Sequence, residues 1–172
     1  GIEAAVVAGI GIGVPGPLNQ ATGKTIAPPI MPGWSGVSIR DSFSAALGMP
    51  VMADNDANLG ALAEYRWGVA QGVRNVAYIY LGTTGIGAGL ILNGSVFRGE
   101  IGSAGEIGHL TIDEDGPLCS CGSYGCLEAM AGLPTLLRQA AEVKNGQSRA
   151  LDQLIREAHN GDQASCQLFV TA

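Results

Sequence analysis

One histidine and three cysteines lie close together in the second half of the chain. They are His109, Cys119, Cys121 and Cys126. Three thiolates and one imidazole make up the ligand set of a closed, tetrahedral structural zinc site. The alternative is a group of free thiols in a mobile glycine-rich loop, which would leave oxidisable side chains exposed with nothing to order the segment. The cysteines are too close in sequence for disulfides to staple a chain of this size, so we expect zinc in a reducing compartment.

A polar cluster lies in the stretch Ala53–Asn58, with the sequence DNDAN from Asp54, where an expected strand gives way to an expected helix. Asp and Asn are preferred N-cap residues, so one member of the cluster is expected to cap the helix. Four polar side chains are more than one cap needs. A carboxylate at a helix N-terminus is held ionised by the helix dipole, which suits a general base that takes a proton from a hydroxyl. Capping and general-base catalysis are both open at this point.

Two glutamates flank the expected zinc ligands. Glu106 lies three residues before His109, and Glu128 lies two residues after Cys126. If zinc ties His109 to the cysteine loop, both acids are drawn toward one place. Two carboxylates, an amide and an imidazole nitrogen could then ring a polyhydroxylated ligand. The alternative is that both glutamates are ordinary solvated side chains.

A glycine-rich segment, Gly82–Gly89 (GTTGIGAG), lies between two expected strands. Backbone amides and threonine hydroxyls in such a segment can approach a phosphate closely. The alternative is a glycine-rich β-turn packed against a neighbouring element.

Apolar spacing and turn residues predict the elements that must position these groups. A strand is expected over Ala5–Val14, and the S-x-x-D pattern from Ser38 begins a helix that Gly48 ends. That helix carries one apolar face: Ile39, Phe43, Ala46 and Leu47. Further strands are expected over 51–54, 75–81 and 86–92, with a hairpin turn at Asn93-Gly94, and further helices over 55–67 (packing through Leu59, Leu62, Ala63 and Trp67), 126–131, 134–144 and 151–160. Alternating strands and helices indicate an α/β layer fold.

The composition is that of a folded domain. Of 172 residues 47% are hydrophobic, and the formal net charge is −6, so the chain can bury a core but has no basic footprint for nucleic acid. No apolar run approaches the roughly 18 residues of a membrane span. We therefore expect a cytoplasmic protein with no membrane partner. The chain begins with Gly1 and ends within a helical pattern, so we expect a fragment of a longer protein.

Four motifs together resemble the ROK family (repressor, open reading frame, kinase), whose members are bacterial sugar kinases and sugar-responsive transcriptional regulators. The motifs are NDAN from Asn55, GTTGIGAG from Gly82, AGEIGH from Ala104 and CSCGSYGCLEA from Cys119. The resemblance implies the two-lobed, actin-like ATPase and sugar-kinase fold, which is related to ribonuclease H. Residues 1–66 would be a remnant of the N-terminal lobe, with a strand, a loop, a helix, a strand and the NDAN helix. Residues 67–172 would begin the C-terminal lobe, with a glycine-rich hairpin, the zinc loop and helices.

The resemblance also implies roles for individual residues. Asp56 matches the catalytic base that activates a sugar hydroxyl. The sugar-contacting positions match Asn55, Asp56, Glu106, His109 and Glu128, and the zinc ligands match His109, Cys119, Cys121 and Cys126. Thr83, Thr84 and Gly85 match the second ATP-phosphate motif. The first such motif, D-x-G-G-T, is absent, so these residues alone are not expected to phosphorylate a sugar.

Two functions follow from the resemblance. The segment IAPPIMPGW from Ile26 is more similar to the regulators of the family than to its dedicated kinases. We therefore expect the sugar-binding module of a sugar-responsive repressor, with a sugar or amino-sugar ligand, operator DNA bound through an upstream domain, and a homodimeric or tetrameric assembly. The alternative is an ATP-dependent hexose or N-acetylhexosamine kinase that uses magnesium and has Asp56 as its general base.

Overall fold

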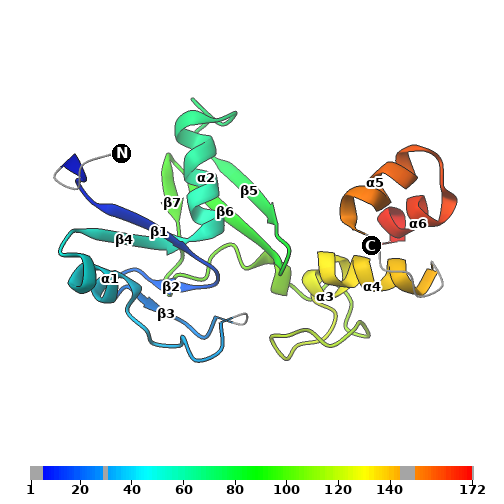
Figure 1. The fold of residues 1–172 in the computed structure, drawn as a ribbon, viewed down its shortest axis with the longest axis horizontal. Coiled ribbons are helices and arrows are strands. Elements are labelled where there is room, and N and C mark those ends of the chain that lie inside the picture. Colours follow the sequence, from blue (N-terminus) through cyan, green and yellow to red (C-terminus); the bar gives the residue numbers. More distant parts are fainter. Residues whose placement is uncertain (1–5, 29–30, 144–149, 172) are drawn as a thin grey trace. The chain divides into compact units, whose positions relative to one another are not determined.

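The computed structural model describes residues 6–28, 31–143 and 150–171. The chain forms two compact units (Figure 1). The first unit consists of Gly1–Tyr80 and Gly87–Glu106, and the second unit consists of Leu81–Ile86 and Ile107–Ala172. Strands and helices together confirm the predicted α/β class. The expected division into two lobes after residue 66 stays a prediction.

The first unit is built on a parallel pair of strands, β1 (Ile10–Val14) and β4 (Val51–Asn55). Their register places Val14 opposite Asn55. Because parallel strands point the same way, the turn after β1 lies beside the start of the polar cluster. This edge of the pair therefore positions the DNDAN residues.

The strand expected from Ala5 is shorter than predicted. Ala5 lies outside the described residues, and β1 begins only at Ile10, which is paired with Val51. The backbone N–H of Ile10 bonds to the carbonyl of Pro50. Since β4 starts only after Pro50, residues 6–9 have no ladder to join.

Between β1 and β4 the chain forms β2 (Leu18–Asn19), β3 (Lys24–Thr25) and α1 (Ile39–Leu47). The predicted start and end signals of α1 are confirmed: the Ser38 side chain accepts from the backbone N–H of Asp41, and Gly48 ends the helix with φ 65°. Its apolar face is less buried than expected. Phe43 and Leu47 are 40% and 50% exposed, whereas Ile39 packs with Val14 and Leu18 in a core cluster.

Helix α2 (Asp56–Trp67) packs on a three-stranded sheet of β5 (Val76–Leu81), β6 (Ile86–Leu92) and β7 (Ser95–Phe97), in the order β5-β6-β7. The helix approaches β6 so closely that a Cβ on Gly89 would lie 2.2 Å from the carbonyl oxygen of Ala57. The hairpin predicted at Asn93-Gly94 is confirmed, with φ values of 52° and 80° that fit a type I′ turn.

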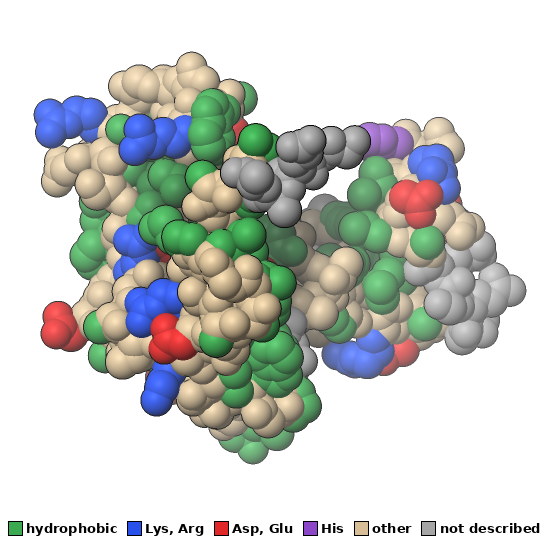
Figure 2. All heavy atoms as spheres, turned by 60° about the vertical axis from the view of Figure 1, so that its left-hand side comes forward, with side chains coloured by type: hydrophobic (Ala, Val, Ile, Leu, Met, Phe, Trp, Pro, Cys, Tyr) green, Lys and Arg blue, Asp and Glu red, His purple; other side chains and the backbone are tan. Residues whose placement is uncertain are grey.

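The face of α2 that packs agrees only in part with the one that apolar spacing predicted: Leu59 and Leu62 are half-buried, but Ala63 is exposed. The buried residues are Ala57, Asn58 and Ala61, whereas Trp67 is 80% exposed. Small residues line the contact because Gly89 brings the two backbones together, which leaves no room for a large side chain. Figure 2 shows that hydrophobic side chains also occupy part of the molecular surface, and Val69, just after α2, is 96% exposed.

The second unit holds a tight turn, a cysteine loop and a group of short helices. The turn, Gly82–Gly85, is closed by a 2.8 Å bond from the N–H of Gly82 to the carbonyl of Gly85. The helices are η2 (Ile107–His109), α3 (Leu127–Ala131), α4 (Leu133–Val143), α5 (Leu151–His159) and α6 (Gln163–Thr171). Ala140, Leu154 and Leu168 form the core cluster of α4, α5 and α6. Among the described residues, no helix is long and apolar enough to span a membrane.

Candidate functional site

Asp54 is a buried carboxylate at the centre of a polar network. It is 7% exposed, and its Oδ2 accepts from Nε and Nη2 of Arg98 at 3.0 and 2.6 Å. Its Oδ1 accepts from the Gln20 side chain at 3.0 Å, the Asn55 backbone at 2.9 Å and the Asn58 side chain at 3.1 Å. A buried charge is tolerated when it is paired and hydrogen-bonded in this way. Asp54 therefore serves to hold the polar cluster together.

Asn55 is the cap that the polar cluster was expected to contain. Its Oδ1 accepts from the backbone N–H groups of Ala57 and Asn58 at 2.9 and 3.1 Å. Its Nδ2 donates to the carbonyl of Gly16 at 3.2 Å, in the turn after β1. Asn55 thus fixes the start of α2 to the end of the parallel pair.

Asp56 is the first residue of α2 and has a different environment from Asp54. Its Oδ1 accepts from the N–H of Ala57 at 2.9 Å, and the residue is half-buried. Within the described part of the chain, Oδ2 of Asp56 accepts no hydrogen bond. At the positive end of the helix dipole, this oxygen is available for a hydroxyl group.

Glu106 ends a loop that is fastened to the sheet. The N–H of Ala104 bonds to the carbonyl of Arg98 at 3.0 Å, and the N–H of Ala88 in β6 bonds to the carbonyl of Gly105 at 2.7 Å. Gly105 has φ 94°, and a Cβ there would lie 1.9 Å from the carbonyl oxygen of Ala88. The loop therefore begins at the partner of Asp54 and ends at Glu106.

The four predicted metal ligands come together in the second unit. Their ligand atoms all lie within 4.8 Å of one another. Sγ of Cys119 is 3.5 Å from Nδ1 of His109, and Sγ of Cys121 is 3.7 Å from Sγ of Cys126. Cys119 and Cys126 are buried, whereas Cys121 is exposed. This cluster, called the metal cluster below, could bind a metal ion.

The thiols of the metal cluster differ in how easily they ionise. A hydrogen bond from the backbone of Ser123 is the main cause that lowers the pKa of Cys121 to about 7. Burial is the main cause that raises the pKa of Cys126 to about 12. Because the thiolate is the metal-binding form, a metal ion would have to displace a proton from Cys126 at neutral pH.

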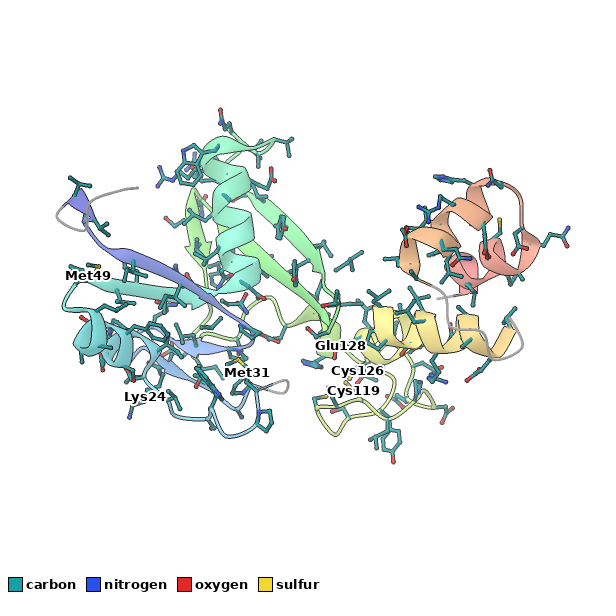
Figure 3. All side chains as sticks on the ribbon, in the orientation of Figure 1. Lys24, Met31, Met49, Cys119, Cys126 and Glu128 are labelled. Atoms are coloured by element: carbon teal, nitrogen blue, oxygen red, sulfur yellow. The ribbon has the colours of Figure 1, made fainter. Side chains whose placement is uncertain are left out.

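Glu128 connects the metal cluster to the glycine-rich turn. It lies in the first turn of α3, which begins after Cys126 (Figure 3). Its Oε2 accepts from the backbone N–H of Ile86 at 3.0 Å. A Cβ on Gly85 would lie 2.3 Å from the same oxygen, so the carboxylate occupies the space left by this glycine. In the turn itself, Thr83 and Thr84 are exposed.

The predicted site residues divide between the two units. Asn55, Asp56 and Glu106 lie in the first unit. The second unit contains Glu128, the four residues of the metal cluster, and Thr83, Thr84 and Gly85. That the two groups serve one sugar stays a prediction.

Sequence reasoning named Asp54 only as a member of the polar cluster, and it missed the partner of Asp54, Arg98. A carboxylate near the end of an expected strand is itself a signal that a partner is needed, and this could have indicated the structural role of Asp54. No local pattern identifies Arg98, because it lies 44 residues further along the chain.

Comparison with known proteins shows a match along almost the whole chain. The model of the ROK family matches residues 3–171. The chain is 42% identical over 135 residues to a glucokinase of Halalkalibacterium halodurans, covering 78% of this chain and 40% of that protein. It is 41% identical over 131 residues to the xylose repressor of Caldicellulosiruptor bescii, covering 76% of this chain and 32% of that protein. The chain thus spans less than half the length of these two relatives.

Solved structures give the same division between kinases and regulators. A ROK family glucokinase from Streptomyces griseus, in complex with glucose and AMPPNP, matches with a TM-score of 0.85 and 32% identity, over 95% of this chain and 57% of that one. A ROK family transcriptional regulator, a homologue of the E.coli MLC protein, matches with a TM-score of 0.80 and 31% identity, over 94% and 42%. The similar proteins therefore include both sugar kinases and regulators.

Proposed function

The chain belongs to the ROK family, and from this premise we propose that it is the sugar-binding module of a sugar-responsive transcriptional regulator. The match to solved kinases and regulators confirms the predicted fold, that of the actin-like ATPases and sugar kinases. The observation that carries sugar binding is the available oxygen of Asp56. It lies at a position that matches a sugar-contacting residue of the family, beside an Asp54 whose oxygens are already occupied.

We propose that five residues contact the sugar: Asn55, Asp56, Glu106, His109 and Glu128. Besides Asp56, three of these side chains have polar atoms left for this task. Nδ2 of Asn55 keeps a second proton beyond its bond to Gly16. Nδ1 of His109 faces Cys119, which leaves Nε2 for a hydroxyl. Oε2 of Glu128 is bonded to Ile86, which leaves Oε1.

We further propose that the metal cluster holds zinc. With Zn–S bonds of about 2.3 Å and a Zn–N bond of about 2.0 Å, a tetrahedron places two sulfurs about 3.8 Å apart and a sulfur and a nitrogen about 3.5 Å apart. The Cys121–Cys126 and Cys119–His109 distances, 3.7 and 3.5 Å, support this assignment. Zinc at this place would order the cysteine loop and orient the His109 ring.

The regulator is favoured by the segment from Ile26 and by the likeness to xylose repressors. Pro29 and Ile30 of this segment lie outside the described residues. In this proposal a sugar or amino sugar binds one conformation of the protein more tightly than another, and so raises the fraction of protein in that conformation. A domain outside these 172 residues would contact operator DNA, in a homodimer or tetramer. A cytoplasmic location is part of the proposal.

Calorimetry and operator binding by the intact natural protein test the regulator. Xylose, glucose, N-acetylglucosamine and N-acetylmannosamine are titrated first, and operator affinity is then measured with and without a saturating amount of the sugar that binds. We expect a change in operator affinity of roughly 5- to 150-fold. A protein that binds no DNA in either state would refute the regulator.

The second candidate is an ATP-dependent sugar kinase. It is favoured by the likeness to glucokinases and by the available oxygen of Asp56, which suits a general base. Thr83, Thr84 and Gly85 would then approach the ATP phosphates, with magnesium neutralising their charge.

A coupled ADP-release assay over the same sugars tests the kinase. The Asp56→Asn variant of the intact protein is expected to lose about 10²- to 10⁴-fold in kcat. Asp152→Asn, an exposed aspartate on α5, serves as the control and should keep its turnover. No sugar-dependent ADP release by the natural protein would remove this candidate.

A further inference from the structure

Helix α3 begins in the metal cluster and carries Glu128 in its first turn. Cys126 is its N-cap residue. The Sγ of Cys126 lies 3.5 Å from the carbonyl oxygen of His109, and the N–H of Leu127 bonds to the carbonyl of Leu110 at 3.0 Å. A five-residue helix is too short to be stable by its own backbone bonds. The place of Glu128 therefore depends on the chain segments that the metal cluster joins.

The carboxylate of Glu128 accepts a hydrogen bond from the backbone N–H of a buried residue in the glycine-rich segment. Ile86 is buried, and its N–H donates to Oε2 of Glu128 at 3.0 Å. A bond to an ionised acceptor is stronger than a bond between neutral groups. Without this acceptor the N–H would be left buried and unpaired, which is costly.

The glycine-rich turn is shaped to receive this carboxylate. Gly85 directly precedes Ile86, and a Cβ there would meet Oε2 of Glu128 at 2.3 Å and its Cδ at 3.1 Å. The φ of Gly85 is not in the left-handed region, so the backbone itself does not require glycine. A Cβ at this position would instead have to displace the carboxylate of Glu128.

We infer that Glu128 is a positioning residue that links the state of the metal cluster to the conformation of the Gly82–Gly85 turn. When the metal cluster is loaded, α3 is fixed, Glu128 holds the Ile86 N–H, and the turn presents Thr83 and Thr84 in one arrangement. When the metal is removed, α3 loosens and the turn is released. The role of this turn in binding phosphate rests on the proposed function, whereas the contact does not.

Hydrogen exchange of the intact, zinc-loaded protein, followed by mass spectrometry over residues 82–87, tests the link. Chelation of zinc and the Glu128→Ala variant should each speed exchange of the Ile86 amide by about 10-fold or more, the loss expected for a bond to a charged acceptor. Zinc added back should restore protection in the natural protein. Glu142→Gln, which removes an exposed charge on α4, is the matched control and should change nothing.

Gly85→Ala provides a second variant if Glu128→Ala fails to fold. It displaces the carboxylate while leaving Glu128 in place, so it should give the same fast exchange with an unchanged zinc content. Folded, zinc-loaded variants with natural protection over 82–87 would overturn the inference, and so would a loss of protection on chelation that neither variant reproduces.

Binding of AMPPNP separates this inference from the proposed function. If the exchange results are as expected and AMPPNP binds more weakly to Glu128→Ala than to Glu142→Gln, both the link and the role of the turn in phosphate binding are supported. If the exchange results are as expected and AMPPNP binds neither protein, the link stands and the phosphate-binding role of the turn is refuted.

Discussion

Asp54 and Asp56 are two residues apart, yet their surroundings give them opposite tasks. The oxygens of Asp54 accept five hydrogen bonds, two of them from Arg98. Asp56 accepts one, from the backbone N–H that follows it. A carboxylate whose lone pairs are all engaged cannot also receive a proton from a ligand without breaking its network. Within the DNDAN cluster, Asp56 is therefore the carboxylate available to a ligand, and Asp54 is the one that holds the cluster in place.

The change Asp54→Asn tests the structural task. It removes the charge that pairs with Arg98 and places an amide proton where an acceptor is needed. We expect the free energy of unfolding to fall by about 2 to 4 kcal/mol, less than for a fully buried pair because the Arg98 side chain is one-third exposed. Chemical denaturation of the intact protein measures this loss.

Asp152→Asn is the matched control for this change. Asp152 pairs with Arg156 at 2.7 Å, but both side chains are about two-thirds exposed. Such a pair contributes about 0.5 kcal/mol or less. Equal losses in the two variants would show that the Asp54 network does not stabilise the fold.

At the scale of elements, α2 and β6 approach each other closely in the first unit. A Cβ on Gly89 would lie 2.2 Å from the backbone oxygen of Ala57 and 2.6 Å from Cβ of Ala61. The backbone cannot move aside as a flexible side chain can. This contact fixes α2, and with it Asn55 and Asp56, to the sheet.

The change Gly89→Ala should therefore be strongly destabilising. We expect a loss of about 1 to 3 kcal/mol or more from overpacking, measured by thermal or chemical unfolding. Gly11→Ala in β1 is the control, because a Cβ there meets nothing within 4 Å; its effect should stay within about 0.5 kcal/mol. Comparable losses at the two positions would contradict the close packing of α2 on β6.

The elements that sequence predicted well are those specified by local chemistry. The caps at Ser38 and Asn55 and the turn at Asn93-Gly94 each depend on residues within one turn of the chain. The metal cluster was predictable because its ligand types are rare and close in sequence. Contacts across long stretches of chain were not predictable: Arg98 to Asp54 spans 44 residues and Glu128 to Ile86 spans 42.

The second source of error in the sequence-based predictions was the choice of which helix face is buried. Helical spacing of apolar residues placed Trp67 on the buried face of α2, but the contact with β6 is made through Ala57 and Ala61. Large apolar residues indicate burial in general, whereas the distance between two backbones decides which face can pack. A glycine in the partner strand, Gly89, was the only available signal.

At the scale of the whole molecule, each unit has an apolar cluster of its own, and the cysteine loop of the second unit lies outside both clusters. The first unit has an apolar cluster around Ile39 and the paired strands β1 and β4. In the cysteine loop of the second unit, Leu110, Ile112 and Leu118 are exposed. Backbone hydrogen bonds, such as those from the N–H of Ile112 to the carbonyl of Gly125 and from the N–H of Cys119 to the carbonyl of Ser123, hold this loop together with the metal cluster. Loss of the metal should therefore destabilise the cysteine loop of the second unit and leave the first unit folded.

Lowering the pH provides a way to measure how far the cysteine loop depends on the metal. In the metal-free cluster the pKa of Cys121 is lowered to about 7, so below about pH 7 a proton competes with the metal for this thiolate. The pKa of Cys126 is raised to about 12, so metal binding at neutral pH releases a proton. Zinc affinity should consequently rise with pH, by about tenfold per pH unit for each proton released.

Limited proteolysis between pH 8 and pH 6, with a chelator as competitor, should cut first within residues 110–125, while β1, β4 and α2 stay intact. Cuts that appear in both units together, or zinc retention that is independent of pH, would show that the metal cluster does not stabilise the cysteine loop.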